Sequence, residues 1–586
     1  MNEKYIVNFI NQNQSIEVNK GTTIFGAFRA AGLPLNLECN GRGLCGKCMV
    51  KIEKEGSLSN VLACITAIDS NLNIYSENGE QNSSLKANIL ESYTPEDNYE
   101  FRPLITKSYV DINDLKIKSE EYLQGCDFNA LKKYSDLMYE ENCKGITFIK
   151  EENHIIDIQP NDTTAYLYGA AIDIGTTSVV IYIYDLNTGI LLKTYSELIM
   201  QISLGADIIS RINYAQSKSG LNELKDKILL TINKMLYEAQ LEFPYFTDNI
   251  YNIVMCGNSA MQHLLFGFRT DGLGCSPFVN ITKDYVECFG NEIEINCPER
   301  SRLVFLPLLG GFVGSDMTSV LLASEDDNKI KLIIDLGTNG EIAVGNINKY
   351  LVASTACGPA LEGGSIDWGM RGTIGAIDRF KIEKDEIHFR TIGGSEPKGI
   401  CGSGVLDIAS ELLRMDIIDE TGRMITGEEL ARKSPGSKLC DKLIQINGIT
   451  VFVLYSDNDK TIYISQKDIR QIQLAKSSIY SGCIALIEAY GINLNEIDEI
   501  ILSGAFGNYI DIYNAVKIGL LPYRSNINFK SIGNGAGMGV CMYLLDKNMK
   551  KKCDGIVKNT IHYELAGDEG YTKGFIENMN FDAKIY

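Results

Sequence analysis

The sequence of 586 residues predicts a multidomain α/β protein. Its length indicates several domains, because one hydrophobic core rarely serves more than about 250–300 residues. Three observations divide the chain: closely spaced cysteines near its start, a polar segment after them, and a twice-repeated Asp-x-Gly-Thr pattern farther on. We therefore expect four parts. They are a small β-rich domain over residues 1–83, a linker over 84–103, a small α+β middle domain over 104–165, and a duplicated α/β domain over 166–586.

The first part shows the order strand, strand, helix, cysteine loop, strand. Apolar and polar residues alternate within 5–18 around one polar turn, which predicts two paired strands. One of two adjacent threonines is placed to cap a helix that runs to Ala31, before a glycine and a proline. Further strands are expected at 48–53 and 72–75. This order is that of a β-grasp ferredoxin domain.

The cysteine spacing is C-x5-C-x2-C, followed by a fourth thiol after fifteen residues; the four are Cys39, Cys45, Cys48 and Cys64. This grouping suits a [2Fe–2S] cluster, since the plant-type pattern differs by one residue in the first gap. Glycines between the cysteines let backbone N–H groups approach the sulfurs. A tetrahedral zinc site is the alternative, although zinc ribbons usually carry two C-x2-C pairs. A disulfide is a third reading, which the absence of an export signal disfavours.

The charge, the apolar runs and the cysteines of the chain exclude several classes of function. The chain has 55 Lys and Arg against 75 Asp and Glu, a net charge of −20 without a basic cluster. This argues against nucleic acid and anionic membranes as partners. The longest apolar runs, such as 303–309, are too short to span a bilayer, and the first residues do not resemble a signal peptide. Twelve further cysteines without paired spacing suit a reducing cytoplasm.

The repeated pattern predicts two phosphate-binding hairpins. Near Asp173 and again near Asp335, an apolar strand ends in aspartate and a Gly-Thr turn opens another strand. One copy is typical of any tight turn, whereas two copies 162 residues apart indicate two related lobes that face a cleft. Glycine N–H groups and threonine hydroxyls donate to phosphate oxygens, and the aspartates are placed to hold Mg2+ through its waters.

A third glycine turn follows the strand 499–502 and is placed to lie against an adenosine. A later glycine run at 533–537 begins a helix, expected to be the last long one, whose N-terminus attracts anions. The candidate ATP-binding residues are therefore Asp173, Gly175, Thr176, Thr177, Asp335, Gly337, Thr338, Asn339, Gly504, Ala505, Phe506 and Gly507, with Asp173 and Asp335 also as Mg2+ ligands.

Two such hairpins and a late glycine turn resemble the actin, sugar-kinase and Hsp70 ATPases, whose two lobes are duplicated ribonuclease-H-like units. Over essentially its whole length, the chain resembles the ATP-dependent reductive activators of corrinoid proteins, which join a [2Fe–2S] domain to such an ATPase. The middle domain offers no motif to compare. Besides the cysteines and hairpins, the resemblance is carried by the runs 205–212, 257–264, 310–316, 356–364, 399–404 and 466–470.

The resemblance implies an ATP-hydrolysing enzyme that passes one electron from its [2Fe–2S] cluster to the inactive Co(II) state of a corrinoid protein in a methyltransferase system, restoring Co(I). An upstream electron donor is also implied, and a homodimer remains an open arrangement. Two other functions stay open. One is activation of a non-corrinoid metalloenzyme, and the other is a small-molecule kinase with a fused redox-sensing ferredoxin.

The resemblance also suggests catalytic residues. Asp316, nineteen residues before Asp335, stands where the superfamily places the residue that orients the attacking water. The alternative role of Asp316 is a helix N-cap on 317–323. Asp316, Asp173 and Asp335 are therefore the candidate catalytic residues.

Overall fold

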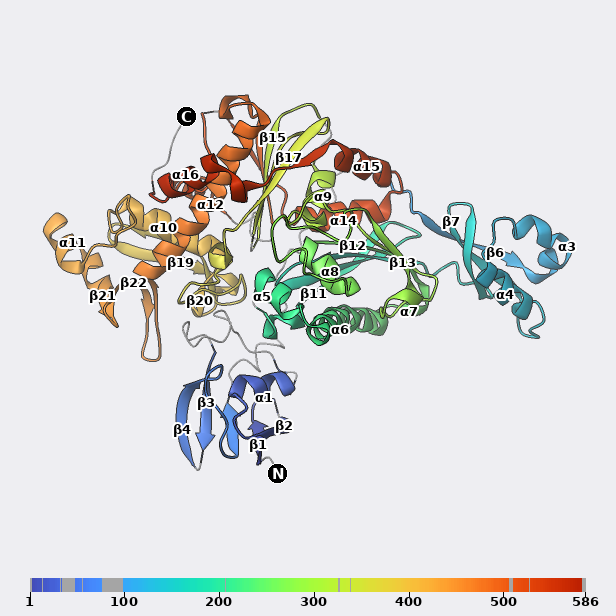
Figure 1. Cartoon of the computed structure of the whole chain (residues 1–586), viewed down its shortest axis with the longest axis horizontal. Coiled ribbons are helices and arrows are strands. Elements are labelled where there is room, and N and C mark those ends of the chain that lie inside the picture. Colours follow the sequence, from blue (N-terminus) through green and yellow to red (C-terminus); the bar gives the residue numbers. More distant parts are fainter. Residues whose placement is uncertain are drawn as a thin grey trace.

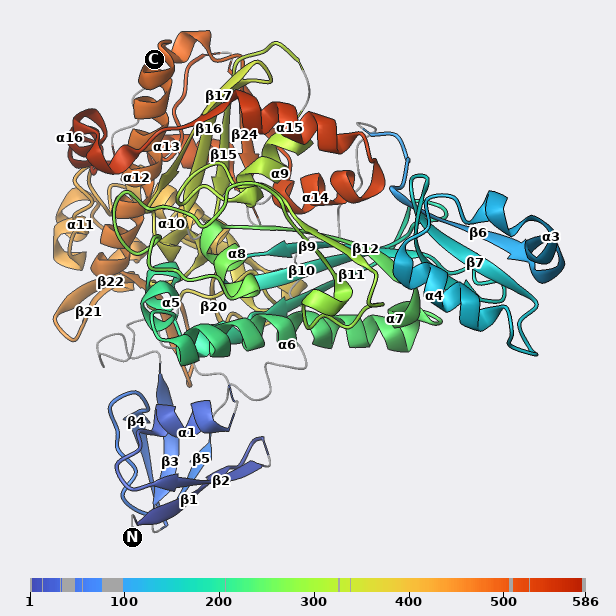
Figure 2. The same cartoon turned by 45° about the vertical axis from the view of Figure 1, so that its right-hand side comes forward.

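The computed structural model describes residues 3–12, 14–31, 33, 48–54, 56–75, 99–205, 207–324, 327–337, 339–504, 510–525 and 527–581. Figure 1 shows the N-terminal domain in blue at the bottom, a small domain in lighter blue at the right, and the two lobes of a large domain in green to red above the first and to the left of the second. Figure 2 shows the same arrangement from another side, with α6 along the lower edge of the first lobe.

The N-terminal domain is a five-stranded sheet of order β2-β1-β5-β3-β4 with one helix. Its elements are β1 (Lys4–Phe9), β2 (Gln14–Asn19), α1 (Ile24–Ala30), β3 (Met49–Lys54), β4 (Ser57–Leu62) and β5 (Leu72–Tyr75). Thr23 caps α1 by accepting from the Gly26 N–H at 3.1 Å, and Phe28 packs edge-on against Phe9. The expected order of strands and helix is confirmed, with β4 as an additional strand, while the expected cysteine loop between α1 and β3 lies outside the described residues.

The middle domain is a three-stranded antiparallel sheet with two helices. They are β6 (Ile105–Asp111), α3 (Ile112–Tyr122), α4 (Phe128–Leu137), β7 (Gly145–Glu151) and β8 (His154–Pro160). The expectation of one helix at about 129–141 is wrong in number, because α3 is a second helix. Along α3 only Leu115 is buried, so its sequence carries little of the apolar periodicity that reveals a helix.

The first lobe is a six-stranded sheet of order β11-β10-β9-β12-β14-β13, flanked by helices. The long helix α6 lies along one side of this sheet (Figure 2). The elements are β9 (Tyr168–Ile174), β10 (Ser178–Asp185), β11 (Ile190–Leu198), α5 (Ile208–Tyr214), α6 (Lys218–Glu242), α7 (Phe246–Asn249), β12 (Ile250–Gly257), α8 (Ser259–Phe266), β13 (Val286–Phe289), β14 (Arg302–Phe305) and α9 (Ser315–Ala323).

The second lobe is a six-stranded sheet of order β25-β24-β15-β16-β17-β26 with two inserted three-stranded sheets. Its strands are β15 (Lys331–Leu336), β16 (Gly340–Asn346), β17 (Lys349–Thr355), β18 (Ala376–Glu383), β19 (Glu386–Thr391), β20 (Gly399–Ile400), β21 (Leu443–Ile446), β22 (Ile449–Ser456), β23 (Thr461–Ser465), β24 (Glu499–Ser503), β25 (Asn528–Ser531) and β26 (Thr560–His562). Its helices are α10 (Gly402–Arg414), α11 (Gly427–Lys433), α12 (Gln466–Tyr490), α13 (Ile512–Lys517), α14 (Gly535–Leu545), α15 (Met549–Asn559) and α16 (Glu569–Glu577).

The two lobes repeat one strand arrangement, which confirms the predicted duplication. In the first lobe β9 pairs antiparallel with β10 and parallel with β12. In the second lobe β15 pairs antiparallel with β16 and parallel with β24. A helix follows the next parallel strand in each lobe, α9 after β14 and α14 after β25, and these two helices pack together. The expectation that α14 is the last long helix is wrong, since α15 has the same length.

The end of the predicted linker is attached to the large domain. The Arg102 N–H donates to the Leu545 carbonyl, and the Lys547 N–H donates to the Arg102 carbonyl, both at 2.9 Å. Residues 84–98 of that linker lie outside the described part of the chain. Among the described residues, no helix combines the length and apolar character that a bilayer crossing requires.

Candidate functional site

Both Asp-x-Gly-Thr patterns form the predicted hairpins. Asp173 is the last residue but one of β9, and Asp335 holds the same position in β15. The first turn is closed by the Gly175 N–H, which donates to the Ser178 carbonyl at 3.0 Å, and the second by the Gly337 N–H, which donates to the Asn339 carbonyl at 3.0 Å. Thr176 and Thr177 belong to the first turn, whereas Thr338 lies outside the described residues.

The third glycine turn begins beside the second hairpin. Gly504 follows β24 with φ of +106°, and a Cβ at this position would lie 2.3 Å from the Leu336 carbonyl oxygen. Only glycine therefore fits without displacing the backbone. The Gly504 N–H donates to the Gly533 carbonyl at 2.8 Å, which joins this turn to the segment before α14. The predicted Ala505, Phe506 and Gly507 lie outside the described residues.

Asp316 lies in the first turn of α9, and the helix N-cap is Gly314. The capping alternative for Asp316 is therefore wrong. Its carboxylate accepts from the Met317 N–H at 2.8 Å. Burial and the neighbouring Asp335 raise the pKa of Asp316, with a smaller effect of Asp173. The structure thus brings together the three aspartates that the sequence places 143 and 19 residues apart.

A fourth carboxylate, Glu341, joins these aspartates and was missed in the sequence. It is the second residue of β16, directly opposite Asp335, and its side chain is buried. Burial, then Asp316 and Asp335, hold the pKa of Glu341 well above its usual range. The available signal was an acidic residue within a strand that is otherwise apolar.

The buried carboxylates lie close enough to raise one another's pKa, but no three or more His, Cys, Asp or Glu side chains of the described residues are grouped so that they could hold a metal ion directly. Burial raises the pKa of Asp173, and burial followed by Asp173 and Glu362 raises that of Asp335 to about 6. Within the described ranges, the Asp335 Oδ1 is buried and has no hydrogen-bond partner. Mg2+ keeps much of its hydration shell in proteins, so Asp173 and Asp335 could hold such an ion only through its waters.

Two asparagines form hydrogen bonds to the first hairpin, and the sequence had indicated a role for neither. Asn534 caps α14, where its Oδ1 accepts from the Gly537 N–H at 2.9 Å, while its Nδ2 donates to Asp173 Oδ2 at 2.9 Å. Asn258 caps α8 and donates through Nδ2 to the Thr176 hydroxyl at 3.1 Å. Helix N-termini therefore surround the first hairpin, in keeping with a phosphate site.

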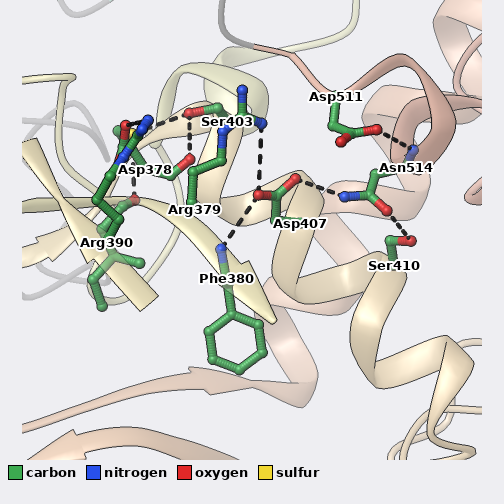
Figure 3. A network of polar contacts seen from close by, with 11 residues as sticks. Asp378, Arg379, Phe380, Arg390, Ser403, Asp407, Ser410, Asp511 and Asn514 are labelled. Carbon is green, nitrogen blue, oxygen red and sulfur yellow. Dashed lines mark hydrogen bonds and ion pairs between the residues drawn. The ribbon is translucent and has the colours of Figure 1, made fainter. Parts of the chain in front are cut away.

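A buried polar network holds α13, the helix that follows the third glycine turn in the sequence (Figure 3). Asp407 on α10 accepts from Asn514 Nδ2 at 2.8 Å and from the Phe380 N–H at 3.3 Å, and Arg379 lies 3.7 Å away. The Ser410 hydroxyl donates to Asn514 Oδ1 at 2.8 Å. Burial raises the pKa of Asp407. This network connects the inserted sheet with α13.

In the N-terminal domain, two of the predicted cysteine ligands lie together. Cys48 precedes β3 and Cys64 follows β4, and their sulfurs are 3.2 Å apart. The Ala63 N–H donates to the Cys48 carbonyl at 3.0 Å, which fixes this approach. No disulfide joins these two sulfurs, which argues against the disulfide alternative for this pair. Cys39 and Cys45 lie outside the described residues.

Comparison with known proteins decides the family. Residues 8–69 match a 2Fe–2S iron–sulfur cluster binding domain, residues 168–329 the RACo middle region, and residues 329–585 the C-terminal ASKHA domain of RACo. The corrinoid activation enzyme RamQ of Eubacterium limosum is 39% identical over 582 residues, which cover 98% of each chain. This chain belongs to the family of ATP-dependent reductive activators of corrinoid proteins.

Two further relatives agree with this assignment. A solved reductive activator for a corrinoid, iron–sulfur protein superimposes with a TM-score of 0.74 at 26% identity, covering 98% of both chains. The [Co(II) methylated amine-specific corrinoid protein] reductase of Methanosarcina barkeri is 24% identical over 395 residues, 61% of this chain and 66% of that protein. The activator thus carries a [2Fe–2S] domain and an ATPase domain, and the zinc alternative is not supported.

Proposed function

We propose that this activator uses ATP to drive one electron from its [2Fe–2S] cluster to the Co(II) state of a corrinoid protein, restoring Co(I) for methyl transfer. The observation that carries the proposal is the presence, in one chain, of a 2Fe–2S domain and a two-lobed ATPase domain with a buried carboxylate site. The names of the relatives support the same activity for this chain. An upstream donor must then reduce the cluster again.

The proposed cluster ligands are Cys39, Cys45, Cys48 and Cys64. When bound, the cluster supplies the electron. Cys48 is 1% exposed and packs with apolar residues of the N-terminal domain. Such a surrounding limits water around the ligand sulfurs, and solvent exposure is one of the factors that set cluster potentials.

At the ATPase site, the backbone N–H groups and threonine hydroxyls of both hairpins would bind the phosphates. Asp173 and Asp335 would hold Mg2+, and Asp316 would orient the attacking water at the start of α9. This role requires a carboxylate held in a fixed orientation. The Met317 N–H donates to Asp316 Oδ1 and so fixes the carboxyl group, which leaves Oδ2 for the water. The adenosine would lie near Gly504.

Nucleotide binding can drive an uphill transfer only by favouring one conformational state over another. The proposed site draws residues from both lobes, with Asp173 in the first and Asp335 in the second. ATP would therefore stabilise a particular arrangement of the lobes, and hydrolysis would release it. For the transfer of one electron, each tenfold change in the equilibrium constant of the transfer corresponds to a change of about 59 mV in reduction potential difference.

The test mixes reduced activator with a Co(II) corrinoid protein and follows Co(I) absorbance and phosphate release. Wild-type protein should form Co(I) only with Mg-ATP. Asp316→Asn should bind ATP normally but hydrolyse it about 100-fold more slowly or worse. Asp284→Asn, an exposed aspartate of the same lobe, is the matched control. Phosphorylation of a small acceptor without corrinoid dependence would contradict the proposal.

We also propose that the activator works in the reducing cytoplasm. None of its described cysteines is joined in a disulfide, including the exposed Cys275 of the first lobe. Cysteines in this number without disulfides are typical of a reducing compartment.

A further inference from the structure

We propose that the N-terminal domain docks reversibly on the first lobe through one ionic contact, in which Arg29 binds Tyr214 and Glu223. These residues are hereafter called the latch. Arg29 lies in the last turn of α1, Tyr214 ends α5, and Glu223 lies near the start of α6. Figures 1 and 2 both show α1 at the edge of the blue domain that faces α6. The inference concerns how the proposed electron donor is positioned, and it rests on the proposed function.

The latch geometry is specific for a guanidinium group. Arg29 Nη2 lies 2.5 Å from Glu223 Oε2, and Arg29 Nε lies 3.3 Å from Glu223 Oε1. Arg29 Nη2 also donates to the Tyr214 hydroxyl, and the guanidinium lies 5.0 Å from the centre of the Tyr214 ring. That hydroxyl in turn donates to Glu223 Oε2 at 2.6 Å. A two-pronged carboxylate pair and an aromatic face both favour arginine over lysine.

The contact is weak enough to be reversible. The Arg29 and Glu223 side chains are 37% and 35% exposed, so water and salt screen their attraction. Within the described parts of the chain, the hydrophobic core of the N-terminal domain contains only residues of that domain. No shared apolar core therefore adds to the latch. Because both partners belong to one chain, an effective concentration of about millimolar compensates for weak affinity.

Docking through α1 also affects access to the cluster ligands. The Phe25 N–H of α1 donates at 2.8 Å to the carbonyl of Ala63, the residue before Cys64. Cys64 lies beside Cys48, so this ligand pair is next to the helix that contacts the lobe. When the N-terminal domain is docked, the end that carries α1, Cys48 and Cys64 therefore faces the ATPase domain. Release would expose the same end to a corrinoid partner, so we infer that the docked position is a resting one.

Charge reversal in full-length, cluster-loaded protein tests the latch. Small-angle X-ray scattering at 50 mM salt should show a longer maximum dimension for Arg29→Glu and for Glu223→Arg than for wild type. The double variant R29E/E223R should return to the wild-type value, and wild type in 1 M salt should match the single variants. Arg432→Glu, at an exposed arginine of α11, is the control. Unchanged dimensions in the single variants, or a double variant that stays extended, would overturn the proposal.

Kinetics test the resting role. At limiting corrinoid protein, the single variants should form Co(I) several-fold faster than wild type, and the double variant should restore the wild-type rate. Slower Co(I) formation in the single variants would mean that docking assists transfer, which overturns the resting role. If wild type forms no Co(I) at all, the proposed function fails, while the scattering result still decides whether the latch exists.

Discussion

Replacement of Asp335 by asparagine should stabilise the nucleotide-free activator at neutral pH while it abolishes ATP hydrolysis. Burial, followed by Asp173 and Glu362, raises the pKa of Asp335 from 3.8 to about 6. The folded protein therefore holds an ionised carboxylate in a place that disfavours its charge, and its Oδ1 has no hydrogen-bond partner in the described part of the chain. Asparagine keeps the shape of this side chain and removes the charge.

The size of the effect follows from the two pKa values. A difference of about 2 pKa units, at about 1.4 kcal/mol per unit, corresponds to about 3 kcal/mol. Because the folded-state pKa is the higher one, the folded protein binds this proton more tightly than the unfolded chain does. The resulting destabilisation is absent below pH 3.8, grows as pH rises, and is complete above about pH 6. The new amide N–H groups also need acceptors, which should reduce the gain to about 1–3 kcal/mol.

Thermal unfolding in EDTA, without nucleotide, measures this gain. For a large domain, each kcal/mol shifts Tm by about 2 °C, so Asp335→Asn should unfold about 2–6 °C above wild type at pH 8. At pH 5 the gain should be roughly half as large, because the wild-type carboxyl group is then largely protonated. Mg-ATP should raise Tm of wild type and leave the variant nearly unchanged. A lower Tm at both pH values, or the same gain at both, would refute the reasoning.

Two further predictions concern the other parts of the machinery. Cys48→Ala should lose the cluster, so that iron and sulfide analysis falls below two of each per chain and the reduced EPR signal disappears; an unchanged signal would show that Cys48 is not a ligand. Asn534→Ala should slow ATP hydrolysis about tenfold, because Asp173 loses its side-chain donor from α14. Exposed Asn187→Ala is the matched control, and equal turnover in both variants would remove Asn534 from the site.

Local patterns explain what could be predicted from the sequence. The two hairpins were predicted because aspartate, glycine and threonine stand within a few residues at the end of an apolar strand. The N-terminal domain was predictable for the same reason, since its strands alternate and a threonine precedes its helix. By contrast, α3 was missed because only Leu115 along it is buried. Packing of α3 against the rest of the middle domain, rather than an apolar periodicity in its sequence, stabilises that helix.

Long-range partners explain what could not be predicted. Asn534 and Asp173 are 361 residues apart, and Arg29 and Glu223 are 194 apart. Neither pair has a local signature, because asparagine before a glycine-rich helix is an ordinary cap and an arginine on a short helix is an ordinary surface residue. Glu341 was missed for a related reason. Its importance follows only from the antiparallel register that places it opposite Asp335.

The two lobes place different side chains at equivalent helix ends beside the site. Each lobe sends one helix to it, α9 after β14 and α14 after β25. The first turn of α9 carries the acid Asp316, whereas the cap of α14 is the amide Asn534. A second acid at position 534 would face Asp173 with its charge, while the amide donates a hydrogen bond to it. Corresponding helix ends of the two lobes thus carry different groups: an acid in α9, for which we propose the orientation of the attacking water, and in α14 an amide that donates to Asp173.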